Sequence, residues 1–126
     1  AYGIQTIAAE CYTLGVKAGV DPKPLMETIA NGSAGRGTLF QHTFAETFFQ
    51  GKFEPPQFAL QLAFKDVGLG VALGREYSVP MATANLVYQE LTTAMNRGWQ
   101  DSDSRVAMCL QEERAGVQVR VADRIS

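Results

Sequence analysis

Two adjacent charges in the middle of a long apolar segment are the residues that point most directly to chemistry. Lys65 and Asp66 lie within residues 58–80, which are otherwise mostly apolar. An unpaired charge inside a protein is costly, so this pair predicts either partners or exposure to a cleft. A lysine ammonium can donate hydrogen bonds to an anionic or carbonyl group of a ligand, with Asp66 orienting it or holding a neighbouring helix. The alternatives without a function are a salt bridge within the helix and a solvated notch on its surface.

The remaining reactive side chains form no second candidate site. An enzyme active site needs a nucleophile with a base, a pair of carboxylates or a metal set, and the sequence offers none of these. Cys11 and Cys109 lie far apart within apolar helical patterns, so we expect reduced, buried thiols, although a disulfide is an alternative. Two cysteines and one histidine do not have the spacing of a metal site. We expect His42 to be structural or exposed to solvent.

Length, composition and charge limit the classes of protein to which the chain can belong. Its 126 residues suit one domain, and 46% apolar with 19% charged residues are typical of a globular protein. A net charge of −2 and the lack of a basic run argue against nucleic-acid binding. No apolar stretch approaches the roughly 20 residues that cross a membrane, so we expect a cytoplasmic protein with no membrane partner.

The two ends of the sequence and its glycine-rich segment carry further expectations. The chain opens inside a helical pattern, without methionine and without the basic region of a signal peptide, so we expect it to be part of a longer protein. Residues 31–37 are glycine-rich but lack the preceding strand and the spacing of a dinucleotide loop, which predicts a connector. Residues 117–126 alternate like a strand that has no partner, which predicts an extended or disordered tail.

Helical periodicity dominates the rest of the chain and predicts one all-α domain over residues 1–126, a bundle of about six helices. The expected helices span about residues 4–18, 22–31, 38–50, 58–79, 81–97 and 105–116. Asp21 with Pro22 predicts the start of the second helix, because aspartate is a common N-cap and proline is favoured in the first turn.

Two of these helices have unusual compositions. Gly68, Gly70 and Gly74 lie within the fourth, where each glycine costs about 1 kcal/mol relative to alanine. Close approach by another helix or by a ligand is the expected reason, so we expect this helix to be central, with its charged spot facing a cleft. The third helix is rich in phenylalanine, which favours a role in the core or in a subunit contact over a cofactor site.

Five short motifs together resemble one known family. They are Ala9-Glu10, residues 17–22 (Lys-Ala-Gly-Val-Asp-Pro), residues 31–33 (Asn-Gly-Ser), the string Phe58-x6-Lys-Asp-Val-Gly-Leu69, and Val79-Pro80. Over about residues 1–116 the chain resembles the C-terminal helical domain of the β-hydroxyacid dehydrogenases, which include 3-hydroxyisobutyrate dehydrogenases and tartronate semialdehyde reductases. The string from Phe58 to Leu69 is the most specific of the five. The fold implied is that of the 6-phosphogluconate dehydrogenase-like C-terminal domains.

The resemblance implies a function for this domain and for three of its residues. In the family an N-terminal Rossmann domain binds NAD or NADP, while the helical domain closes the active site and makes most of the dimer contact. By resemblance, Lys65 reaches the nicotinamide cofactor, Asp66 supports the same site and Phe58 is a wall of the pocket for a small hydroxy acid. We also expect a homodimer or a higher homo-oligomer, with apolar surfaces of the first and the Phe-rich helices covered in it.

The sequence departs from the family at the catalytic lysine, which the family carries in a Lys-x-x-Asn-Asn motif at the start of the first helix. No such motif occurs here, so the catalytic lysine is expected upstream of Ala1, as is the cofactor-binding glycine loop. The chain alone is therefore not expected to transfer hydride. A non-catalytic oligomerisation or binding module is the main alternative, and an unrelated helical binding bundle is another.

Overall fold

The computed structural model describes residues 1–32 and 36–121, without the side chains of Ile7, Glu10, Cys11 and Leu14. The expectations for Cys11, Ser33 and residues 122–126 thus lie outside the described residues. Six α-helices are α1 (Tyr2–Lys17), α2 (Pro22–Ala30), α3 (Phe44–Glu46), α4 (Leu60–Glu76), α5 (Ala82–Asn96) and α6 (Cys109–Ala115). Three shorter turns of other pitch are η1 (Leu39–Thr43), η2 (Phe48–Gln50) and η3 (Ser104–Met108). The described residues contain no strand, which confirms the all-α prediction.

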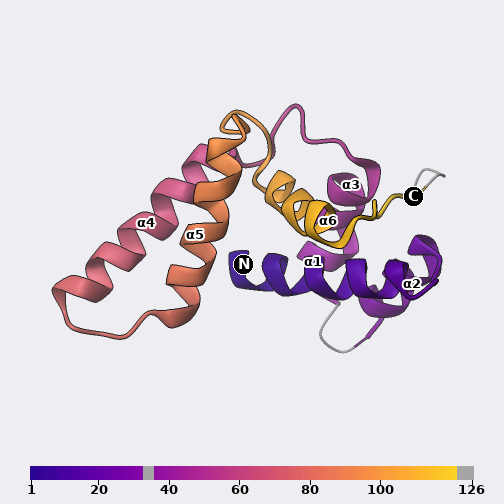
Figure 1. Ribbon diagram of the computed structural model, residues 1–126, viewed down its shortest axis with the longest axis horizontal. Helices are drawn as coiled ribbons and strands as arrows, with labels where there is room; N and C mark the ends of the chain where they lie inside the picture. Colours follow the sequence, from indigo (N-terminus) through magenta and orange to yellow (C-terminus); the bar gives the residue numbers. More distant parts are fainter. Residues whose placement is uncertain (33–35, 122–126) are drawn as a thin grey trace.

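The helices divide into a body and a projecting hairpin (Figure 1). In the body, α1 packs against α2 and α6, and the segment from η1 to η2 completes its core. The hairpin consists of α4 and α5, which pack along one another and meet the body through η3 and the first turns of α1. A second core cluster, which includes Leu60, Leu91 and Leu110, fills the base of the hairpin.

The Phe-rich segment is not the single helix expected over residues 38–50. It runs through η1, α3 and η2, and the chain leaves helical geometry at Thr47, with φ −111° and ψ −80°. Its side chains nevertheless fill the core, since Phe44, Phe48 and Phe49 are fully buried. The core interpretation is therefore confirmed. The expected apolar outer surface on this helix is wrong, because its aromatic rings interlock with Tyr12 of α1 instead.

The fourth helix is shorter and less central than the sequence predicts. It begins at Leu60, because Ala59 is extended with ψ 143°, and it ends at Glu76. It lies at one end of the molecule and packs mainly on α5 and η3 (Figure 1). Apolar residues occupy two opposite faces of this helix. In the sequence this pattern looks the same as that of a helix buried on all sides. Only one of those faces is covered by the described residues.

Residues 117–121, the described part of the predicted tail, have no regular secondary structure and pack against the body. The Glu112 carboxylate accepts hydrogen bonds from the Val119 amide at 2.6 Å and from Arg120 Nη1 at 2.7 Å. The Val121 amide donates to the Phe49 carbonyl, and both valines are buried in the core of the body. A carboxylate on α6, rather than a second strand, thus provides the hydrogen-bond partner for this stretch of backbone.

Candidate functional site

A pocket of about 640 Å³ opens between the first turn of α1 and the hairpin. Its volume lies in the range of small-molecule sites. The lining is mostly small and apolar, from three parts of the chain: Ala1, Tyr2, Gly3, Val67, Gly70, Pro80, Met81, Ala82, Thr83, Ala84 and Val87. Small side chains at the start of both α1 and α5 keep these two helices close while leaving the space between them open. Tyr2 and Thr83 are the hydrogen-bonding side chains of this lining.

The three glycines of α4 have different surroundings. A Cβ at Gly68 would meet the Tyr88 ring at 3.0 Å, and one at Gly74 would meet the Met81 side chain, so both are explained by packing within the hairpin. Nothing lies within 4 Å of a Cβ at Gly70, which lines the pocket. A helical glycine costs about 1 kcal/mol relative to alanine, and no contact within the described residues explains the one at position 70. This position therefore leaves room for a group from outside the described chain.

Lys65 and Asp66 are exposed on α4, and neither has a hydrogen bond or ion pair within the described residues. The salt-bridge alternative is therefore not observed. Their helical positions place them on the outer face, beside Leu62 and Leu69, and neither lines the pocket. Gly70 follows Asp66 by about one turn, so Asp66 is at the edge of the pocket, whereas Lys65 lies on another side of the helix.

Phe58 lies away from the pocket, at the base of the hairpin. It is half-buried and packs against the second core cluster. Its backbone is fixed by η3: the Asp103 carboxylate accepts the Gln57 and Phe58 amides at 2.8 and 3.2 Å, and the Phe58 carbonyl accepts the Ser104 amide at 2.8 Å. The structure thus places Asp66 near the pocket. Phe58 lies away from the pocket, in contact with the second core cluster.

Tyr2 is the pocket residue that the sequence analysis missed. Burial raises the pKa of its phenol above the ordinary value, the Arg105 charge opposes this, and the charges of Asp66 and Asp103 add to it. The phenol is therefore neutral at physiological pH and can donate a hydrogen bond. The one available signal was weak: Tyr2 precedes the buried Gln5 by three residues, so both lie on the inner side of α1.

The other reactive side chains do not form a site. Burial, reinforced by Glu112, raises the pKa of the Cys109 thiol to about 12, so this free cysteine is not a thiolate at neutral pH. His42 is exposed to solvent, which is one of the two possibilities expected from the sequence, the other being a structural role. Among the side chains that the structure describes, no group of three or more His, Cys, Asp or Glu residues could hold a metal ion. No described helix has the length and hydropathy needed to cross a membrane.

Three kinds of comparison with known proteins agree with one another. The family model described as "NAD-binding of NADP-dependent 3-hydroxyisobutyrate dehydrogenase" matches residues 2–110. A 2-(hydroxymethyl)glutarate dehydrogenase from Eubacterium barkeri is 30% identical over 111 residues, which are 88% of this chain and 36% of that protein. A solved 3-hydroxyisobutyrate dehydrogenase from Salmonella typhimurium has a similar fold, with a TM-score of 0.67 at 20% identity, over 86% of this chain and 38% of that one. The chain thus spans little more than a third of either relative.

Proposed function

Because this chain belongs to the 3-hydroxyisobutyrate dehydrogenase family through its NAD-binding helical domain, we propose that it forms one wall of a dehydrogenase active site. The reaction proposed is hydride transfer between NAD or NADP and a small 3-hydroxy acid or its semialdehyde. One observation carries the proposal: α4 combines an unpaired, exposed Lys65 with a glycine, Gly70, that is open to approach at an apolar pocket.

The residues around the pocket fit a nicotinamide cofactor. Lys65 would add a positive charge near its phosphates or ring, with Asp66 supporting that site, and the open surface at Gly70 would admit a flat group close to the helix backbone. The apolar lining would exclude water, which strengthens electrostatic interactions inside the site. When bound, the cofactor supplies the hydride donor or acceptor. The proposed contribution of Phe58 to the hydroxy-acid site would be made outside this pocket, at the base of the hairpin, against a segment from outside the printed sequence.

The general acid–base lysine is not among these residues. In this proposal a segment outside the printed sequence supplies it, together with the glycine-rich cofactor loop. Such a lysine would give or take the proton of the substrate oxygen as hydride moves. The chain by itself would then close the active site without catalysing the reaction.

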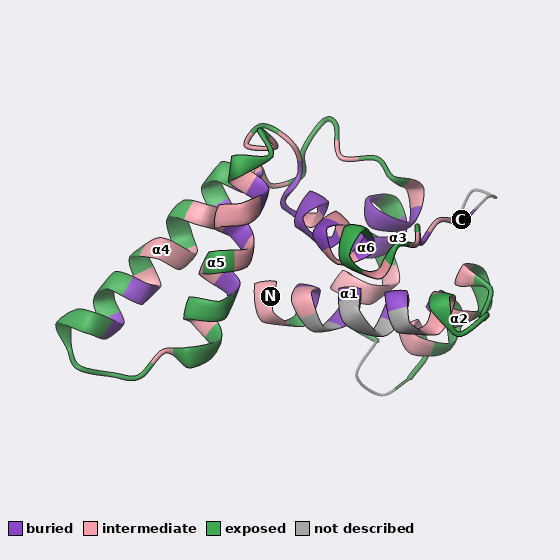
Figure 2. Ribbon diagram, in the orientation of Figure 1, coloured by how far each residue is buried: buried purple, intermediate pink, exposed green. Residues whose placement is uncertain are grey.

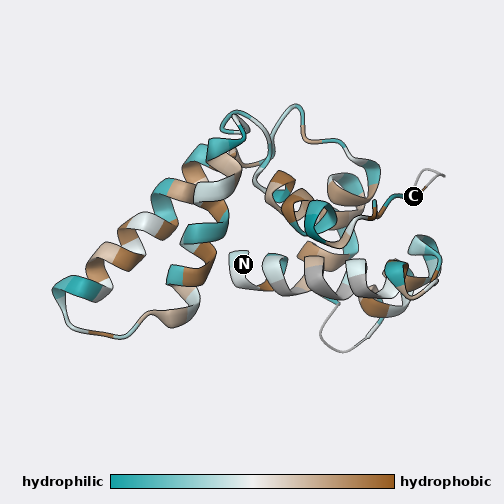
Figure 3. Cartoon of the chain, in the orientation of Figure 1, coloured by the Kyte–Doolittle hydropathy of each residue, from teal (hydrophilic) through white to brown (hydrophobic). Residues whose placement is uncertain are grey.

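Self-association through the hairpin is the second part of the proposal. Six large apolar residues between positions 62 and 86 are 47–69% exposed, namely Leu62, Leu69, Leu73, Tyr77, Val79 and Leu86. Apolar stretches along the outside of the hairpin are visible in Figure 3. Large apolar side chains gathered on one projecting element are typical of interfaces, so we propose a homodimer or higher homo-oligomer that covers them. The same surface favours the alternative function, a non-catalytic oligomerisation module.

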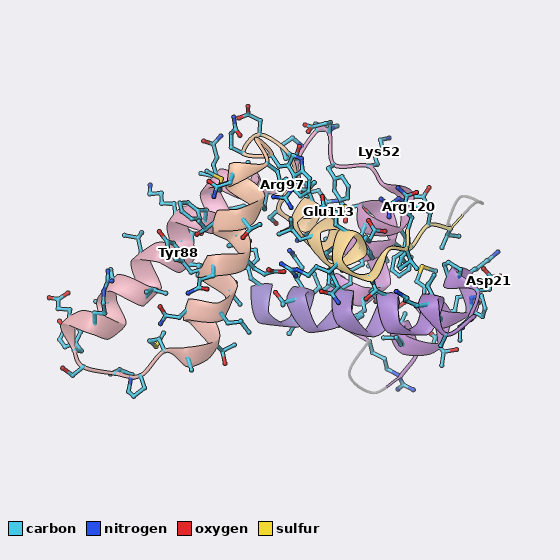
Figure 4. All side chains as sticks on the ribbon, viewed as in Figure 1. Asp21, Lys52, Tyr88, Arg97, Glu113 and Arg120 are labelled. Atoms are coloured by element: carbon cyan, nitrogen blue, oxygen red, sulfur yellow. The ribbon has the colours of Figure 1, made fainter. Side chains whose placement is uncertain are left out.

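Activity of a joined protein would separate the two functions. This chain is placed behind the remainder of the Eubacterium barkeri enzyme, in place of the segment that it matches, and oxidation of 3-hydroxyisobutyrate and 2-(hydroxymethyl)glutarate is followed with NAD and with NADP. We expect oxidation of at least one acid, and Lys65→Ala should raise the KM for the cofactor about tenfold, as expected for loss of a charged contact. Lys52→Ala, at an exposed lysine outside the pocket (Figure 4), is the matched control. A folded joined protein that binds cofactor but oxidises neither acid would favour the oligomerisation module.

A further inference from the structure

We propose that Asn31 is a site of spontaneous covalent modification. Its side-chain amide is lost when the backbone nitrogen of Gly32 attacks it, which leaves aspartate or isoaspartate at position 31. Three features of the chain support this: both residues are exposed, they lie at the end of α2, and the attacking residue is a glycine. The modification does not depend on the proposed function.

Asn31 and Gly32 lie at the open end of α2. Asn31 is the C-cap of this helix, with φ −90° and ψ −3°. Its side-chain nitrogen Nδ2 donates to the Glu27 carbonyl at 2.8 Å, and the Gly32 amide donates to the Ile29 carbonyl at 3.2 Å. Helix ends fray at little cost in free energy, so these contacts open more often than those inside a helix. Both groups that must react are therefore accessible to water.

The reaction is balanced with water as its co-reactant. The Gly32 nitrogen, after it loses its proton to hydroxide, forms a bond to the side-chain carbonyl carbon of Asn31, and the bond from that carbon to Nδ2 breaks. The departing amino group takes up a proton and leaves as ammonia, which gives a cyclic imide. Water then breaks one of the two imide C–N bonds. The product is aspartate or, when the bond to the backbone carbonyl carbon breaks, isoaspartate.

Glycine at position 32 favours this attack in two ways. It has no Cβ beside the attacking nitrogen, and its backbone is freer than that of any other residue, so the peptide group between Asn31 and Gly32 can rotate out of helical geometry. An alanine Cβ at this position would lie 3.3 Å from the Ile29 carbonyl oxygen, which would crowd the nitrogen against the end of the helix. A residue with a side chain at position 32 should therefore slow the reaction.

Asn85 makes the same side-chain contact in a different setting. Its Nδ2 donates to the carbonyl of Met81, four residues earlier, at 2.8 Å, and Asn85 is exposed like Asn31. Asn85 lies within α5, however, and Leu86 follows it. Attack there requires the helical backbone to open next to a branched side chain, which costs more free energy than movement at a helix end. Asn85 is thus a matched control within the chain.

Loss of the Asn31 amide would loosen the end of α2. A carboxylate cannot donate to the Glu27 carbonyl, and its negative charge would lie at the negative end of the helix dipole. Gln41 Nε2 donates to the Ala30 carbonyl at 2.6 Å, so the last turn of α2 also holds η1. The modification would therefore weaken the contact between α2 and η1.

Ageing of the full chain, followed by mass spectrometry of its peptides, tests the inference. The folded chain is incubated at neutral and at mildly alkaline pH, and each asparagine peptide is followed for the gain of one mass unit. We expect Asn31 to convert about tenfold faster than Asn85, equivalent to a barrier about 1.4 kcal/mol lower, and faster still at the higher pH. Gly32→Ala should slow the conversion of Asn31 by a similar factor. Gly37→Ala, at an exposed glycine that follows Arg36, should not.

Two results would overturn the inference: conversion of Asn31 no faster than that of Asn85, or a rate at Asn31 that Gly32→Ala leaves unchanged. Hydrogen exchange measures the effect on α2 separately. The amides of residues 31 and 32 should exchange faster in Asn31→Asp than in the wild-type chain, whereas Asn85→Asp should leave their exchange unchanged. Equal exchange in Asn31→Asp and the wild-type chain would contradict the loosening of α2.

Discussion

The body and the hairpin use the same kinds of apolar residue in opposite ways. In the body, Phe44, Phe48 and Phe49 have no exposed surface, whereas in the hairpin Leu69 and Leu86 are 60% and 62% exposed. Figure 2 shows the contrast, with the outer face of the hairpin largely exposed. Burial in the body is thus satisfied by the chain itself, while the hairpin presents a second apolar face without a partner among the described residues. The body therefore buries its apolar residues within the chain, whereas the exposed face of the hairpin is the surface that we propose for binding.

The largest effect that separates the two regions should come from truncating one side chain in each. Phe48→Ala would leave a cavity among Tyr12 and Phe49 and should lower the free energy of unfolding by about 3–5 kcal/mol. Leu69→Ala should change it by less than about 0.5 kcal/mol, because an exposed leucine loses few contacts. Urea unfolding followed by circular dichroism measures both. Equal losses in the two variants would contradict the division into body and hairpin.

The next effect concerns pH and the body alone. Burial raises the pKa of Cys109 from 9.0 to about 12, so the folded state resists losing a proton that the unfolded state releases. The stability contributed by the neutral thiol is fully present below pH 9 and is lost as the pH rises toward about 12, by on the order of 4 kcal/mol. Cys109→Ser should flatten this part of the curve of unfolding free energy against pH. An unchanged curve would mean that the thiol is not desolvated.

Weakening the contact between the body and the hairpin should lower the free energy of unfolding by an intermediate amount. The Asp103 carboxylate accepts the amides of Gln57, Phe58 and Arg105, and so holds the start of α4 against η3. Asp103→Asn should lower the free energy of unfolding by about 2 kcal/mol, since a charged acceptor is replaced by a weaker neutral one. Hydrogen exchange at residues 57 and 58 should speed up in parallel. Asp21→Asn, at an exposed aspartate whose side chain makes no cap hydrogen bond, is the control; matching losses in both variants would argue against a connecting role for Asp103.

A substitution on the exposed face of the hairpin should have the smallest effect on the free energy of unfolding but a large effect on self-association. Leu69→Ser on the hairpin should leave unfolding nearly unchanged but weaken self-association by about tenfold or more, if this face is the interface. Val20→Ser changes another exposed apolar residue (43% exposed) outside the hairpin and should not alter the sedimentation profile. A wild-type chain that sediments as a monomer at high concentration would remove the hairpin from the proposed interface.

Sequence patterns predicted which segments are helical better than they predicted where those helices lie. Period and composition identified the α-helical class, and Pro22 and Gly116 lie at the expected start of α2 and end of α6. They could not reveal that α4 is peripheral, because a helix with apolar residues on both faces has the same pattern whether its second face meets this chain or another. The break at Thr47 and the carboxylate that holds Val119 likewise depend on tertiary contacts.

The candidate site was only partly predictable for the same reason. The string from Phe58 to Leu69 indicated Lys65 and Asp66, and the three glycines indicated a close approach to α4. Which glycine remains open, and the placement of Tyr2 beside Asp66, depend on how α1 meets the hairpin. That meeting joins residues more than 60 positions apart, a separation on which local periodicity carries no information.

The most direct test of the account is to map nicotinamide cofactor binding onto this chain. Amide chemical shifts would be recorded while NADPH or NADH is added, with Lys65→Ala and the control Lys52→Ala in parallel. The account predicts weak binding with shifts concentrated at residues 65–70 of α4 and around the pocket, lost in Lys65→Ala and retained in Lys52→Ala. Shifts confined to the body, or equal binding by the two variants, would contradict the claim that the hairpin carries the functional surface.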